Sequence, residues 1–106
     1  MEFDGAYVGT KLKYKVEITA EGFSMDKDDF EVEVRRGKQS VVIKKEDMLI
    51  HEPEEGENEY FITIDTEALG PGTYEVITRA YVPDDDFEEG VRLEIDKQTL
   101  IVVASI

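Results

Sequence analysis

The chain has 106 residues, of which 41% are hydrophobic and 36% charged, a balance typical of one globular domain rather than of a disordered segment. It contains no cysteine, which excludes a disulfide framework and a thiolate metal site. Its formal net charge is −14, and residues 46–106 carry the whole excess with three basic and seventeen acidic side chains. We therefore expect no binding to nucleic acid or to anionic membranes.

The N-terminal stretch MEFDGAYVGT has no basic region followed by an apolar one, so we expect no secretory signal. No apolar run approaches the ~20 residues that a membrane helix needs. The expected location is the cytoplasm, unless a larger assembly carries the protein out of it.

Alternating apolar and polar side chains predict strands in the first half of the chain. Residues 11–18 and 30–35 both alternate without interruption, and a turn at Gly37 followed by residues 40–44 predicts a hairpin. The side chains predicted to face inward are Leu12, Tyr14, Val16, Ile18, Phe30, Val32 and Val34.

The second half follows the same pattern, after residues 48–50, which we leave unassigned. The polar stretch 52–59 is predicted to be a loop, 60–64 a strand, and 65–70 one helical turn capped by Asp65 or Thr66 and ended by Gly70. The longest predicted strand is 73–82, which buries Tyr74, Val76, Ala80 and Val82. Residues 91–95 and 99–103 are two further strands, or one long strand broken near Lys97.

About seven short strands and no helix longer than a turn predict an all-β fold. The predicted architecture is an immunoglobulin-like antiparallel β-sandwich, formed by residues 1–106 as a single domain. The cysteine and tryptophan signature of antibody domains is absent, so the comparison concerns architecture alone.

Two acidic clusters contain the same Asp-Asp-Phe motif, ending at Phe30 and Phe87. Clustered carboxylates are calcium ligands, although Ile95 stands where an EF-hand starting at Asp84 needs its last glutamate. An irregular site joining both loops stays open, and the alternative is turn chemistry in which both phenylalanines enter the core. The candidate ligands are Asp26, Asp28, Asp29, Asp84, Asp85 and Asp86.

Catalysis is not expected. The single histidine, His51, lies beside the glutamate-rich loop with no serine or cysteine nucleophile near it in the sequence, and no glycine-rich phosphate loop is present. We expect neither an enzyme nor a bound cofactor, apart from the calcium considered above.

A protein contact is expected on the long strand. Ile77, Arg79 and Tyr81 have the opposite parity to Tyr74 and Val76, so they form a mixed apolar and cationic stripe on the outer face, or are covered by loops. Arginine and tyrosine are enriched in protein interfaces. The apolar run 99–106 is expected either to be buried on both sides or to pair with another subunit.

Several motifs resemble a known group of proteins. GFSMDKDDFEVEV (22–34), KKEDM (44–48), DTEALGPGTYE (65–75) and AYVPDDDFEEGVRLEI (80–95) resemble small proteins from phages and prophages of gut bacteria. Residues 8–10 and 69–74 resemble the N-terminal domain of phage baseplate upper proteins, an immunoglobulin-like sandwich of tail assembly, although Thr10 replaces an acidic residue. The likeness runs from about Val8 to Val103.

This resemblance implies a non-enzymatic structural or assembly protein of a phage or prophage particle, in the tail, the baseplate or the head. Its expected partners are copies of itself, as a homo-oligomer, or other virion proteins, and it would stay in the cytoplasm until assembled into a virion. Two alternatives remain: a calcium-dependent binding or adhesion module, and an acidic decoy that mimics DNA.

Overall fold

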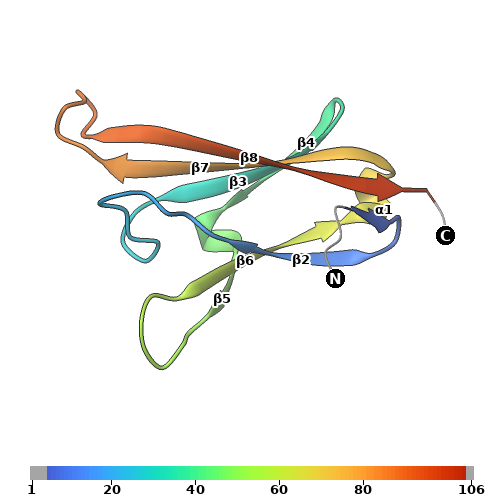
Figure 1. The fold of residues 1–106 in the computed structure, drawn as a ribbon, viewed down its shortest axis with the longest axis horizontal. Helices are drawn as coiled ribbons and strands as arrows, with labels where there is room; N and C mark the ends of the chain where they lie inside the picture. Colours follow the sequence, from blue (N-terminus) through green and yellow to red (C-terminus); the bar gives the residue numbers. More distant parts are fainter. Residues whose placement is uncertain (1–4, 105–106) are drawn as a thin grey trace.

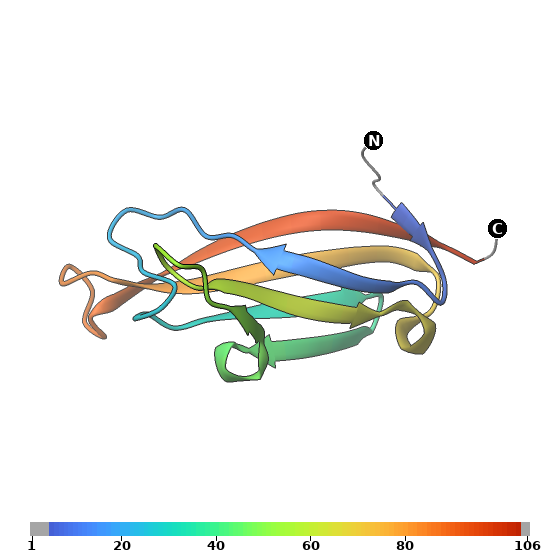
Figure 2. The ribbon, with the colours of Figure 1, turned by 90° about the horizontal axis from the view of Figure 1, so that it is seen from below.

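A computed structural model describes residues 5–104 of the chain, which form an all-β fold in two layers (Figures 1 and 2). The strands are β1 (Gly5–Tyr7), β2 (Lys11–Val16), β3 (Phe30–Arg36), β4 (Gln39–Lys44), β5 (Leu49–His51), β6 (Glu59–Asp65), β7 (Gly72–Pro83) and β8 (Val91–Val103). Two short helices, η1 (Lys45–Asp47) and α1 (Thr66–Leu69), connect strands.

The strand order is that of an immunoglobulin-like sandwich. One sheet has the order β1-β8-β7-β3-β4 and the other β2-β6-β5, so β3, β7 and β8 take the places of strands C, F and G, and β2 and β6 those of B and E. The other strand pairs of residues 5–104 are antiparallel, as predicted, and β1 alone among them pairs with its neighbour, β8, in parallel.

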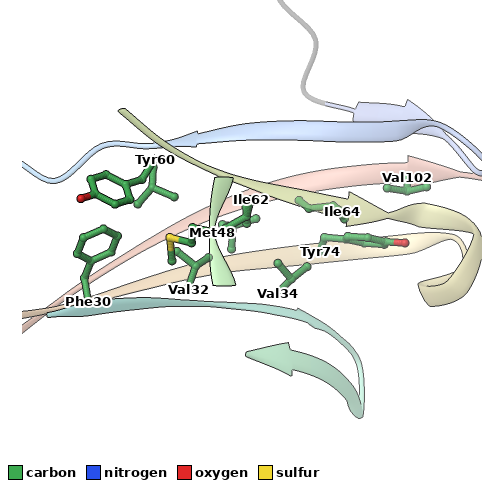
Figure 3. Packing of buried hydrophobic residues seen from close by; sticks show 11 residues of the cluster. Phe30, Val32, Val34, Met48, Tyr60, Ile62, Ile64, Tyr74 and Val102 are labelled. Atoms are coloured by element: carbon green, nitrogen blue, oxygen red, sulfur yellow. The ribbon is translucent and has the colours of Figure 1, made fainter. Parts of the chain in front are cut away.

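The core lies between the two sheets, as the alternation in the sequence predicts (Figure 3). The ring of Phe30 meets that of Tyr60 from the facing sheet edge to face, with centroids 5.2 Å apart, an arrangement that aromatic pairs prefer. The buried apolar cluster comprises Val16, Phe30, Val32, Val34, Met48, Tyr60, Ile62, Ile64, Tyr74, Val76 and Val102.

The helical turn before β7 forms as predicted. Asp65 accepts hydrogen bonds from the amides of Glu67 and Ala68, and Gly70 ends the turn with φ +81°, which favours glycine. The buried hydroxyl of Tyr74 donates to the main-chain oxygen of Gly70, which is the tyrosine corner found at this place in immunoglobulin-like folds.

The structure departs from the expectations in three places and excludes one of two alternatives for the C-terminal run. Strand β1 was not predicted, and residues 91–103 form one unbroken strand through Lys97. Phe87 is 49% exposed and does not anchor its loop in the core, because its turn extends past the end of the sandwich (Figure 1). The run 99–104 is not buried on both sides, since Ile101 and Val103 are exposed beside the buried Val102; residues 105 and 106 lie outside the described range.

Candidate functional site

Three acidic loops, formed by residues 17–29, 52–58 and 84–90, lie at the same end of the sandwich, opposite α1 (Figure 1). Hydrogen bonds connect loop 17–29 to its two neighbours. The Ser24 hydroxyl donates to the Glu57 carboxylate in loop 52–58 at 2.7 Å. The guanidinium of Arg92, at the base of loop 84–90, donates to the main-chain oxygen of Glu21 at 3.4 Å. The fold thus places the two clusters that the sequence suggests as calcium ligands at the same end of the sandwich.

Within the first cluster, however, the carboxylates bind protein groups. Asp26 accepts from the Tyr60 hydroxyl at 2.8 Å, and Asp28 from the amide of Ser24 at 2.8 Å. Asp29 accepts from its neighbouring amide, that of Phe30, at 3.0 Å. The contacts of Asp28 and Asp29 are local side chain–backbone bonds of a polar turn, whereas that of Asp26 links the loop to β6.

The second cluster shows the same chemistry. Asp84 accepts from the amide of Asp86 at 3.0 Å and from Arg92 at 2.9 Å, while the side chain of Asp85 is exposed. Both contacts lower the pKa of Asp84, with the amide of Asp86 as the larger cause. Within residues 5–104, no three His, Cys, Asp or Glu side chains are grouped so as to hold a metal ion.

A lysine of the chain itself occupies the inside of the first loop. The Lys45 ammonium donates to the main-chain oxygens of Asp26 and Asp28, each at 2.9 Å. It also lies 5.4 Å from the centroid of Phe30 and 5.6 Å from that of Tyr60, within cation–π range. Two main-chain oxygens of this loop therefore already bind a cation, the ammonium group of Lys45, a contact that the sequence does not predict.

The predicted interface residues Ile77, Arg79 and Tyr81 share one face of β7, the outer face of the five-stranded sheet. The smaller sheet covers the opposite face (Figure 2). Ile77 is only 7% exposed and Tyr81 is partly exposed. The structure therefore places the three side chains together on the face opposite the core, although it leaves little of Ile77 accessible.

Arg79 is held in an ion-pair network. Its guanidinium lies 2.6 Å from Glu33 and 3.3 Å from Glu31 on the neighbouring β3. Arg35 and Lys44 complete the network, at 3.1 Å from Glu33 and 2.6 Å from Glu31, respectively. The hydrogen bond from Arg79 is the largest cause that lowers the pKa of Glu33, so both charges are fixed at neutral pH.

Two apolar side chains of β8 extend this outer face. Leu93 lies opposite Tyr81 and Ile95 opposite Arg79 in the β7–β8 ladder, and Ile95 is 61% exposed. The sequence places residues 91–95 in a strand but does not show which face its apolar side chains take. Together, Arg79, Tyr81, Leu93 and Ile95 form the candidate interaction face, and we call it the outer patch.

A polar groove lies on the other side of β8, between this strand and residues 17–20. Its volume is ≈ 440 Å³, within the range of ligand-binding clefts. The sequence analysis did not identify it, because its two walls are far apart in the chain. The lining residues are Glu17, Ile18, Thr19, Ala20, Thr78, Ala80, Glu94, Ile95, Asp96 and Gln98.

The remaining carboxylates do not line one face. Glu75 lies on the outer face of the large sheet, whereas Glu94 and Asp96 face inward from β8. Asp65 and Glu67 lie at α1, at the end opposite the acidic loops (Figure 1). This distribution over several faces argues against a DNA-mimicking decoy, which needs its charges along one surface.

His51 has no catalytic surroundings in the described part of the chain. The exposed imidazole packs against the Phe61 ring, with centroids 4.5 Å apart, and its Nε2 lies 3.3 Å from the Lys13 ammonium. No hydroxyl or carboxylate is within hydrogen-bond distance of it in residues 5–104, so it forms no nucleophile–base pair there.

Comparisons with family models, curated proteins and solved structures gave no match to this chain. In the part of the chain from Gly5 to Ala104, no helix has the length and apolar character needed to cross a membrane.

Proposed function

We propose that the chain is a non-enzymatic structural or assembly protein of a phage or prophage particle, acting through contacts with copies of itself or with other virion proteins. The motif resemblance supports the particle assignment. The single observation that carries the contact role is the outer patch, a sheet face that no other element of residues 5–104 covers (Figure 2). In it, exposed Leu93 and Ile95 flank a fixed ion-pair network.

The two parts of the patch have different effects on association. Covering exposed aliphatic side chains makes the free energy of association more favourable, by roughly 25 cal/mol per Å² of apolar surface removed from water. The Arg79–Glu33 pair is already formed in the free chain, so covering it does not leave an isolated charge to desolvate. A symmetric dimer through this face would use each residue twice.

Native mass by light scattering, in EDTA and then with calcium restored, tests the self-assembly half of this proposal. We expect a discrete oligomer in EDTA. A monomer in both buffers would overturn self-assembly, and an oligomer that forms only with calcium would favour the calcium-dependent alternative.

A matched pair of variants tests the patch. Ile95→Arg should dissociate the oligomer, whereas Ile50→Arg should preserve it, because Ile50 is similarly exposed, at 49%, but lies on β5 of the other sheet. An oligomer that survives Ile95→Arg assembles through another surface.

The particle assignment has its own test. Particles purified from an induced lysogen that encodes the chain should contain it at a defined copy number per particle, measured by quantitative mass spectrometry. If purified particles lack the chain, this assignment is wrong.

A further inference from the structure

The edge of β8 is open over most of its length. Strand β8 pairs with β7 from Val91 to Val102, but on its other side β1 pairs only with residues 101–103. Within the described residues, the stretch 91–100 therefore has one edge without a strand partner. Such an edge presents unpaired main-chain donors and acceptors.

The direction of these main-chain groups follows from the β1 contact. The amide of Val8 donates to the main-chain oxygen of Val103 at 2.8 Å, so the groups of Val103 point away from β7. Because the direction alternates along a strand, the same edge carries the N–H and C=O groups of Leu93, Ile95, Lys97 and Thr99. Pro83, which has no N–H, lies opposite Val91, as this alternation requires.

The acidic groove runs beside this open edge. Glu94 and Asp96 face it from β8, and Glu17 faces it from the opposite wall. Neither Glu17 nor Asp96 has an ion-pair partner within residues 5–104, whereas Glu94 shares Arg92 with the loop carboxylate of Asp84. The groove therefore retains a net negative charge.

The polar groups around the carboxylates also suit a cationic ligand. Thr78 is 7% exposed and lines the groove, and its hydroxyl forms no hydrogen bond in the described part of the chain. At one end the Tyr14 hydroxyl donates to Gln98 at 2.8 Å. Burial, followed by the charges of Asp96 and Glu17, raises the pKa of Tyr14, in keeping with a negative potential there.

We propose that the open edge of β8 binds an extended segment of a partner protein as an added strand, with lysine or arginine side chains of that segment in the acidic groove. Strand addition supplies main-chain hydrogen bonds, and pockets for alternate side chains supply specificity. The other side chains of the segment would lie beside Leu93 and Ile95 on the outer face. The partner segment therefore alternates basic and apolar residues.

The chain itself contains such a pattern in Lys11–Val16, but there it forms β2 and pairs with β6. The inference deepens the proposed function, since it names the chemistry of one partner. Its test uses a peptide and the isolated chain, so its failure is distinct from a failure of self-assembly or of the particle assignment.

The probe is a fluorescent peptide, Lys-Val-Lys-Val-Lys-Val-Lys, with Glu-Val-Glu-Val-Glu-Val-Glu as its control. By anisotropy, the lysine peptide should bind at least tenfold more tightly than the control, and amide NMR shifts should concentrate on residues 93–99. Equal affinity of the two peptides, or shifts confined to loops 52–58 and 84–90, would overturn the proposal.

A pair of double variants isolates the groove from general charge. Glu94→Gln with Asp96→Asn should weaken binding at least tenfold. Asp86→Asn with Glu88→Gln removes the same charge from an exposed loop and should change affinity less than twofold. Equal losses in both variants would show unspecific attraction and refute the groove.

Main-chain pairing is tested with the protein unchanged. Two further peptides carry N-methyl groups on all lysines or on all valines. A strand presents alternate amides to its neighbour, so one of these peptides should lose binding and the other should retain it. If both bind as well as the parent peptide, no strand is added at β8 and the proposal is wrong.

Discussion

The ammonium nitrogen of Lys45 lies 2.9 Å from the main-chain oxygen of Asp26, nineteen residues earlier in the chain. A second contact of the same length reaches Asp28, so one side chain from the helix η1 joins two points of the acidic loop. The cation bound by the main chain of loop 17–29 is therefore the ammonium group of Lys45.

Replacing Lys45 with methionine should destabilise the fold. The variant keeps the aliphatic length but loses two charge-assisted hydrogen bonds, and we expect a loss of about 1–2 kcal/mol in the free energy of unfolding, measured by urea denaturation. Lys27→Met is the matched control, because Lys27 is exposed in the same loop and its side chain makes no hydrogen bond or ion pair within the described residues. Equal effects of the two substitutions would contradict a specific role for Lys45.

Calcium should leave the melting temperature unchanged. The carboxylates of Asp26, Asp28 and Asp84 already accept hydrogen bonds from protein groups, so a metal ion would have to displace them. A site with a dissociation constant of about 1 mM would stabilise the fold by ~1.4 kcal/mol at about 10 mM calcium. A thermal shift of that size in a calcium titration, absent with magnesium, would restore the calcium-binding alternative.

Arg79→Glu should destabilise the protein itself. Arg79 belongs to the outer patch, but its guanidinium also bridges Glu31 and Glu33, and the substitution would set a third carboxylate beside these two. We expect a loss of about 2–4 kcal/mol in urea denaturation. Lys38→Glu, an equal charge reversal in the exposed β3–β4 turn, should cost far less. If Arg79→Glu unfolds like the wild type, the network contributes little to stability.

The Glu33 carboxylate should make stability fall in acid. Its pKa is lowered from the ordinary value of 4.5, mainly by the hydrogen bond from Arg79. A carboxylate with a lowered pKa in the folded state contributes stability that is complete above pH ~4.5 and is lost as the pH falls through the folded-state pKa.

Urea denaturation between pH 3 and pH 7 tests this dependence. Glu33→Gln should be less stable than the wild type near neutrality, and the difference should shrink as the pH falls below ~4.5. Glu88→Gln, in an exposed loop, should follow the wild type throughout. A constant difference for Glu33→Gln over the whole range would show that its ionisation is not linked to folding.

Periodicity predicted most of the fold because burial dictates it. Residues such as Phe30, Val32 and Val34 alternate with charged ones, and one face of their sheet is indeed buried. Strand β1 escaped prediction because three residues, Gly5–Tyr7, are too few to show a period. The sequence suggested a break of β8 near Lys97, because the residues around it are polar and an apolar alternation is missing there. A strand tolerates polar side chains on both faces where no second sheet covers it.

The candidate site was predicted only in part, since its residues come from separate strands. The parity of Ile77, Arg79 and Tyr81 correctly placed them on one face, but the pairing of Arg79 with Glu33 depends on the register of β3 against β7. The acidic groove needs residues 17–20 beside β8, a contact that no local pattern encodes.

The central position of β7 also has a consequence for folding. Strands β7 and β8 form a hairpin with the short connecting loop 84–90. The pairing of β7 with β3, in contrast, joins Phe30 to Ala80, fifty residues apart in the chain. Such distant pairing slows folding relative to helical domains of the same size. The C-terminal hairpin can form early, while the lysine-rich β2 must wait for β6 before its apolar side chains leave water.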